Sequence, residues 1–152
     1  MVHERCVIVN KTKGICLASE ADIARSIITR MKGLIGCTSR EFYPGRGLWL
    51  MPCNGIHTFG MRMPIDVAYL DSKNRVLKLC HRLEPSRVAS LVLRARSVLE
   101  LPSGTLAQTH TEVGDVLEIR GSLAWEQDDS GVSAAAQKSH ERLFGENLNE
   151  WN

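Results

Sequence analysis

Short apolar segments separated by turn-forming residues run through most of the chain. Residues 5–9 are rich in β-forming side chains, residues 10–14 (Asn-Lys-Thr-Lys-Gly) are typical of a turn, and residues 15–18 are predicted to return as the second strand of a hairpin. Further strands are predicted over residues 48–51, 65–70, 75–83, 97–101, 116–120 and 123–125. Pro, Gly, Asn and Asp residues bound these segments, so the pattern indicates a sheet built from short strands.

Residues 19–35 have a helical period rather than a strand period. Ser19 is predicted to begin the helix, because Asp22 follows it at the third position, where a capping box usually has Glu. Gly36 is predicted to end it. The predicted apolar face consists of Ile23, Ile27, Met31 and either Leu34 or Ile35. A shorter helical turn is predicted over residues 105–111.

These elements predict a mainly β (α+β) fold: a small antiparallel β-sandwich or partly open barrel with one main helix packed on it. The chain has 152 residues, which suits one domain, and we expect that domain to span residues 1–125. Residues 126–152 hold six carboxylates against two basic side chains and have little apolar patterning. They are predicted to form an acidic, mobile tail.

The composition is that of an ordinary soluble domain, with 43% hydrophobic and 24% charged residues. No apolar run is long enough to span a membrane, and the first residues lack the apolar core of a signal peptide. The five cysteines are odd in number and include no Cys-x-x-Cys pair, so we expect reduced thiols and a cytoplasmic location.

The net charge of +2 is too small to indicate a nucleic-acid partner. Candidates for a basic surface are Arg82, Arg87, Arg94 and Arg96. Aromatic side chains that would stack on bases are scarce. We therefore expect these arginines to form a solvated face, and we expect no nucleic-acid partner.

The densest group of polar side chains comes just before the most apolar predicted strand and within it. His57, Thr58, Arg62 and Asp66 fall within ten residues, and Cys53 precedes them. A Cys-His-Asp or Thr-His-Asp arrangement of these side chains would give a thiol or hydrolytic enzyme. The structural alternative is an ion pair between Asp66 and an arginine, since a guanidinium matches a carboxylate with two parallel hydrogen bonds.

The side chains of Cys53, His57, Cys80 and His81 are of the types that bind zinc. Their spacing argues against a site, because Cys80 and His81 are adjacent and would face opposite sides of a strand. The chain also has no phosphate-binding loop, dinucleotide-binding fingerprint or nucleophile elbow. We therefore expect neither a metal nor a cofactor.

Five short motifs follow one another along the chain. They are residues 30–35 (Arg-Met-Lys-Gly-Leu-Ile), 57–61 (His-Thr-Phe-Gly-Met), 64–71 (Pro-Ile-Asp-Val-Ala-Tyr-Leu-Asp), 98–104 (Val-Leu-Glu-Leu-Pro-Ser-Gly) and 114–115 (Gly-Asp). In this order and at this spacing they resemble the prokaryotic family called domain of unknown function number 192. The resemblance implies a compact, β-rich fold with a helix that carries Arg30. It implies no reaction, cofactor or substrate.

Many members of that family are similar but read Trp-Met-Lys-Asn-Thr where this chain has residues 57–61. A position that accepts Trp is a poor place for an essential general base, so the resemblance weighs against catalysis by His57. It favours Arg30, Asp66, Glu100 and Asp115 as the main polar residues.

The function that these observations favour is a ligand-binding or accessory domain with a polar pocket for a small anionic ligand. The binding residues predicted for it are Arg30, His57, Thr58, Arg62, Asp66, Glu100 and Asp115. One alternative is a protein-interaction module that uses a sheet edge or an apolar patch. The second alternative is an enzyme that uses Cys53 and His57, and the sequence does not decide whether the protein is an enzyme.

One structural expectation is independent of the function. Arg30 lies in the predicted helix, and Asp66 lies in the most apolar strand. Because a charge is costly to bury alone, we expect Asp66 or Glu100 to lie within salt-bridge reach of Arg30 or Arg62.

Overall fold

The computed structural model describes residues 4–121, without the side chains at positions 27, 28 and 31. The strand predicted over residues 123–125 and the tail predicted over residues 126–152 lie outside the described residues. No helix in the described part is long and apolar enough to cross a membrane.

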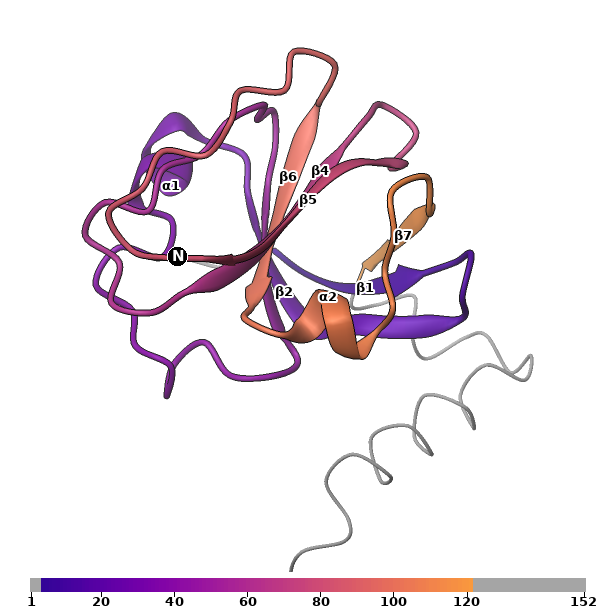
Figure 1. Cartoon of the computed structure of the whole chain (residues 1–152), viewed down its shortest axis with the longest axis horizontal. Coiled ribbons are helices and arrows are strands. Elements are labelled where there is room, and N and C mark those ends of the chain that lie inside the picture. Colours follow the sequence, from indigo (N-terminus) through magenta and orange to yellow (C-terminus); the bar gives the residue numbers. More distant parts are fainter. Residues whose placement is uncertain (1–3, 122–152) are drawn as a thin grey trace, which may run out of the picture. The chain divides into compact units, whose positions relative to one another are not determined.

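Seven strands form one sheet in the order β5-β4-β6-β3-β2-β1-β7 (Figure 1). They are β1 (Arg5–Asn10), β2 (Ile15–Ala24), β3 (Arg46–Leu50), β4 (Ile65–Leu70), β5 (Val76–Leu83), β6 (Ser97–Pro102) and β7 (Leu117–Gly121). Neighbouring strands are antiparallel except β2 and β3, which are parallel. A bridge between Arg75 and Val116 joins the segments that lead into the two edge strands. The sheet therefore curls into a partly closed barrel, which confirms the predicted mainly β class.

The main helix is shorter than predicted. Helix α1 spans Ile27–Lys32, and its capping box is formed by Ser26 and Thr29. Residues 19–24 belong to β2, because their backbone pairs with β1 on one side and with β3 on the other. The carboxylate of Asp22 lies 2.7 Å from Arg46 and caps no helix. The prediction of a helix over residues 19–35 is therefore wrong for its first half, since strand pairing on both sides outweighs the local helical pattern. Its predicted end at Gly36 is also wrong, because the C-cap residue is Gly33.

Small side chains allow β2 and β3 to lie close together at the centre of the sheet. A Cβ atom added to Gly47 would lie 3.1 Å from the Ala18 side chain and 3.2 Å from the Ala21 side chain. A larger residue at position 47 would push the two parallel strands apart. Glycine in the interior of a strand often marks such a close approach.

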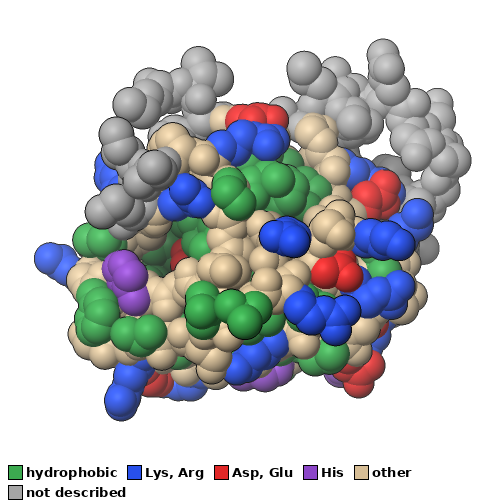
Figure 2. Space-filling model, turned by 90° about the horizontal axis from the view of Figure 1, so that it is seen from above, with side chains coloured by type: hydrophobic (Ala, Val, Ile, Leu, Met, Phe, Trp, Pro, Cys, Tyr) green, Lys and Arg blue, Asp and Glu red, His purple; other side chains and the backbone are tan. Residues whose placement is uncertain are grey.

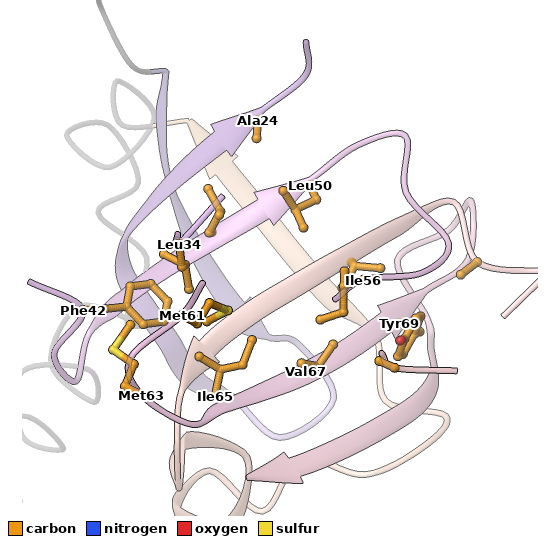
Figure 3. Close-up of a cluster of buried hydrophobic side chains, with 14 residues drawn as sticks. Ala24, Leu34, Phe42, Leu50, Ile56, Met61, Met63, Ile65, Val67 and Tyr69 are labelled. Carbon is orange, nitrogen blue, oxygen red and sulfur yellow. The ribbon is translucent and has the colours of Figure 1, made fainter. Parts of the chain in front are cut away.

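Buried hydrophobic side chains form two clusters, one on each face of the sheet. The inner cluster receives side chains from every strand, for example Ile8, Trp49, Leu70, Val76 and Leu117, and also Leu106 from helix α2 (Thr105–Gln108). The outer cluster lies over β3, β4 and β6. There, Leu50, Val67 and Tyr69 meet side chains from the covering segments, among them Leu34, Phe42, Ile56 and Met61 (Figure 3). Because side chains alternate along a strand, each strand residue belongs to only one of these faces.

Candidate functional site

A pocket of about 320 Å³ lies on the outer face of the sheet, beside α1. It is lined by the end of α1 and the residues after it, by the end of β3, by residues 52–57 and by one residue of β6. The lining residues are Arg30, Lys32, Gly33, Leu34, Ile35, Leu50, Pro52, Cys53, Asn54, Gly55, Ile56, His57, Met61 and Glu100. Figure 2 shows a hollow in which acidic atoms lie deep between hydrophobic side chains, with a histidine near its edge. We call this site the Arg30–Glu100 pocket.

Glu100 is the buried carboxyl group of this pocket. It lies on β6 between Leu48 of β3 and Val67 of β4, and it is 3% exposed. Its Oε2 atom is buried without a hydrogen-bond partner in the described part of the chain. Burial raises the pKa of Glu100 from 4.5 to about 8. At neutral pH the carboxyl group is therefore mostly protonated, and it offers one O–H donor and one carbonyl acceptor.

Arg30 is the matching donor. It lies in the last turn of α1, and its Nη1 donates a hydrogen bond to the carbonyl oxygen of Pro52, which anchors the guanidinium at the wall of the pocket. Its Nε atom is buried and has no hydrogen-bond partner among residues 4–121. Lys32, two residues further on, adds a second cation at the wall of the pocket. The pocket therefore holds an unused N–H donor and an unused carboxyl oxygen, together with two positive charges.

Asp66 lies on the opposite face of the sheet from Glu100. It alternates with Ile65 and Val67, which belong to the outer cluster. Its carboxylate accepts hydrogen bonds from the backbone N–H groups of Arg82 (2.9 Å), Gly104 (3.0 Å) and Leu106 (2.9 Å). These bonds attach the end of β5 and the start of α2 to β4, so Asp66 holds the fold together at a distance from the pocket.

The expectation of an ion pair between an arginine and a buried carboxylate is wrong. Within residues 4–121, no ion pair joins Asp66 or Glu100 to Arg30 or Arg62. Asp66 is satisfied by backbone N–H groups, and Glu100 avoids a buried charge by keeping its proton. The cost of burying a carboxyl group is thus offset by hydrogen bonds at Asp66 and avoided by protonation at Glu100.

Cys53 and His57 both line the pocket, but they do not form a nucleophile with its base. The Cys53 thiol donates a hydrogen bond to the carbonyl oxygen of Gly55 at 3.1 Å, and burial raises the pKa of this thiol. The His57 ring stacks on Phe59, with 5.3 Å between ring centroids. Asp66, the predicted orienting carboxylate, faces the other side of the sheet. The Cys-His-Asp and Thr-His-Asp arrangements are therefore not formed.

Cys53 is expected to react with iodoacetamide at pH 7.5 more slowly than N-acetylcysteine, because burial raises the pKa of the thiol and leaves little reactive thiolate. Timed alkylation followed by mass spectrometry gives a rate for each cysteine. Cys6, whose pKa burial raises to about 11, is the slow internal control. Rapid and selective modification of Cys53 would contradict this expectation and would favour thiol chemistry.

The other predicted binding residues do not line the pocket. The Thr58 hydroxyl donates to the carbonyl oxygen of Glu84 at 2.7 Å and accepts from the backbone N–H of Arg87 at 2.9 Å, which fixes the segment after β5. The Asp115 carboxylate accepts from the Asn10 side chain at 2.8 Å, close to where the barrel edges meet. Arg62 is exposed. Of the seven predicted residues, the structure brings together Arg30, His57 and Glu100.

The candidate zinc ligands are also separated. Cys80 packs against the outer cluster, whereas the next residue of β5, His81, is exposed. Among residues 4–121, no three His, Cys, Asp or Glu side chains gather in a way that could hold a metal ion.

Comparison with known families matches residues 8–119 to domain of unknown function 192, described as an uncharacterized ACR. The chain belongs to this family. It is similar to a UPF0127 protein of Pyrococcus horikoshii, with 32% identity over 117 residues, covering 74% of this chain and 97% of the relative. It is also similar to a UPF0127 protein of Thermococcus sibiricus, with 28% identity over 117 residues, covering 74% of this chain and 73% of that relative.

Two crystal structures share the fold of this family member. One is a candidate transcription regulator from Sinorhizobium meliloti, with a TM-score of 0.64, 21% identity and coverage of 78% of this chain and 94% of that one. The other is a protein of unknown function from Novosphingobium aromaticivorans, with a TM-score of 0.61, 18% identity and coverage of 75% and 83%. At this identity, the likenesses show the fold alone.

Sequence patterns did not point to Lys32, Asn54 and Gly55 as part of a site in this member of the domain of unknown function 192 family. The available signal was residues 52–55 (Pro-Cys-Asn-Gly), which are typical of a turn directly after β3. That turn places residues 52–57 beside α1. Loops held by a rigid sheet often carry binding residues, so the turn could have been read as a wall of the site.

Proposed function

We propose that this protein is a ligand-binding domain that holds a small molecule in the Arg30–Glu100 pocket. One observation carries the proposal: the pocket contains a buried donor, Arg30 Nε, and a buried carboxyl oxygen, Glu100 Oε2, and neither has a hydrogen-bond partner among the described residues. A buried polar group left without a partner costs about 1–3 kcal/mol. A ligand that bonds to both groups would remove this cost.

The remaining lining supports the same proposal. Leu34, Leu50, Ile56 and Met61 give the pocket apolar walls beside the polar side chains of Arg30 and Glu100. Small-molecule sites commonly combine apolar walls with a small number of polar groups that orient the ligand. The pocket is therefore suited to a compact molecule with an apolar body and one polar head group.

The protein-interaction alternative rests on a different feature. Val88, Leu91 and Leu93 are exposed large hydrophobic side chains between β5 and β6. Leu91 also lies against the wall of the pocket, since a Cβ atom added to Gly55 would be 3.1 Å from its side chain. Part of this apolar segment thus already supports the pocket. Exposed leucines alone are common on protein surfaces, so the ligand-binding function is preferred.

Replacing Arg30 by glutamine is expected to weaken small-molecule binding by about tenfold or more, because hydrogen bonds to charged groups are worth about 1.5–3 kcal/mol. The test is a panel of small acids, amides and amines at millimolar concentration, titrated into the full chain and followed by two-dimensional NMR. Binding compounds should shift the signals of Gly33, Gly55 and His57. The Arg40→Gln variant is the matched control, since Arg40 is exposed and does not line the pocket.

Two results would contradict the proposed function. In the first, no compound of the panel shifts the signals of the pocket. In the second, the compounds bind equally well to the wild type, the Arg30→Gln variant and the Arg40→Gln variant, which would place their site elsewhere.

A further inference from the structure

We propose that the Arg30–Glu100 pocket selects a small carboxylate with an apolar body, and that the protonated carboxyl group of Glu100 donates a hydrogen bond to it while Arg30 binds its second oxygen. This inference rests on the proposed function and names the class of ligand. It also gives Glu100 a definite role as a hydrogen-bond donor.

The charges around the pocket favour an anion. Arg30 and Lys32 are its cations, and its one carboxyl group, Glu100, is buried between hydrophobic strands and forms no ion pair within residues 4–121. An ionised Glu100 would therefore be a buried and unpaired charge, which is costly. A protonated Glu100 leaves the pocket with a net positive charge, and a cationic ligand would be repelled.

The groups that face Glu100 from the neighbouring elements do not change the net positive charge of the pocket. Cys53 comes from residues 52–57, and Tyr69 and Cys80 come from β4 and β5 in the outer cluster. Burial raises the pKa of both Cys53 and Tyr69, so both hold their protons at neutral pH. From α1 the pocket receives only cations, and His57 at the wall is exposed.

Hydrogen-bond chemistry distinguishes a carboxylate from other polar head groups. A protonated carboxyl group that donates to a carboxylate oxygen makes a short, charge-assisted O–H···O bond. The second oxygen of the same carboxylate can accept from the Arg30 Nε–H group, which has no other partner in the described residues. An amide or alcohol would accept these bonds through a neutral oxygen, and the bonds would be weaker than those to a carboxylate.

Proton linkage makes the affinity of the pocket for a carboxylate depend on pH. Because the pKa of Glu100 in the free protein is about 8, carboxylate affinity should be nearly constant below that pH and fall about tenfold per unit above it, or about 30-fold from pH 7.0 to pH 9.5. In the Glu100→Gln variant the side-chain amide still donates, but it cannot ionise. That variant should bind several-fold more weakly at pH 7.0, and its affinity should no longer depend on pH in this way.

The experiment uses benzoate, benzamide and benzylamine, which share one shape and carry a negative, zero and positive charge. Each is titrated into the full chain at pH 7.0 and constant ionic strength, and the methyl signal of Met61, which lines the pocket, is followed by NMR. The benzoate titration is repeated at pH 9.5 with the wild type and with Glu100→Gln. We expect benzoate to bind at least about tenfold more tightly than the other two at pH 7.0, because only benzoate presents negatively charged oxygens to both Arg30 and the Glu100 O–H group.

Tighter binding of benzylamine, or equal affinity of the wild type for benzoate at both pH values, would overturn the inference. If benzamide shifts the Met61 signal and benzoate does not, the pocket remains a ligand site and only the assignment to carboxylates fails. If the wider panel of acids, amides and amines also leaves the pocket unchanged, the proposed function fails with it.

Discussion

Replacing Asp66 by asparagine is expected to lower the free energy of unfolding by about 3 kcal/mol, since hydrogen bonds to a buried charged group are worth about 1.5–3 kcal/mol each. The Asp66 carboxylate is 1% exposed and accepts three backbone N–H groups. Asparagine keeps one acceptor oxygen and turns an N–H group toward a backbone donor. A loss of this size is a large fraction of the ~5–15 kcal/mol that holds a domain folded.

Urea denaturation of the wild type and the variant gives the difference directly. Asp71→Asn is the matched control, because Asp71 also accepts backbone N–H groups, from Lys73 and Arg75, but in the turn between β4 and β5 where water can replace it. We expect that control to lose less than about 1.5 kcal/mol. Equal losses in the two variants would show that Asp66 does not have the structural role assigned to it.

Glu100 is expected to make the stability of the wild type fall with rising pH. In the unfolded chain a glutamate ionises near 4.5, whereas burial raises the pKa of Glu100 in the folded protein to about 8. The stabilisation that comes with the bound proton is complete below pH 4.5 and is lost as the pH rises toward 8. The expected slope is about 1.4 kcal/mol per pH unit, or about 4 kcal/mol between pH 5 and pH 8.

The Glu100→Gln variant isolates this effect from the other titrating groups. Urea denaturation at pH 5, 6, 7 and 8 should show the variant gaining stability relative to the wild type at each step. Parallel stability curves for the two proteins would mean that Glu100 ionises normally in the folded state. Glu100 would then not be a protonated hydrogen-bond donor in the pocket at neutral pH.

The strands could be predicted from sequence because their signals are local. Residues 65–70 and 97–101 are apolar runs bounded by turn residues, and both became central strands of the sheet. The prediction of a helix beginning at Ser19 was wrong for a non-local reason. Residues 19–24 have backbone partners on both sides, in β1 and β3, which the sequence of the segment does not reveal.

The pocket could be predicted only in part. Asp66 and Glu100 are both carboxylates within fully buried strands, so neither burial nor apolar pattern tells which face each one occupies. The register of β4 and β6 decides which face each carboxyl group occupies. Asp66 is paired with Leu101, whose side chain is in the inner cluster, and Glu100 is paired with Val67, whose side chain is in the outer cluster. Paired residues share a face of the sheet. A site that depends on register and on covering loops therefore appears only in three dimensions.

A crystal of the full chain soaked with benzoate at pH 7 is the most direct test of the claim that the Arg30–Glu100 pocket is a ligand site. We expect electron density for benzoate in the pocket, with one carboxylate oxygen within hydrogen-bond distance of Glu100 Oε2 and the other facing Arg30 Nε. The ring should lie against Leu50, Ile56 and Met61. Benzoate bound only at other places, with the pocket unchanged at saturating concentration, would contradict the claim.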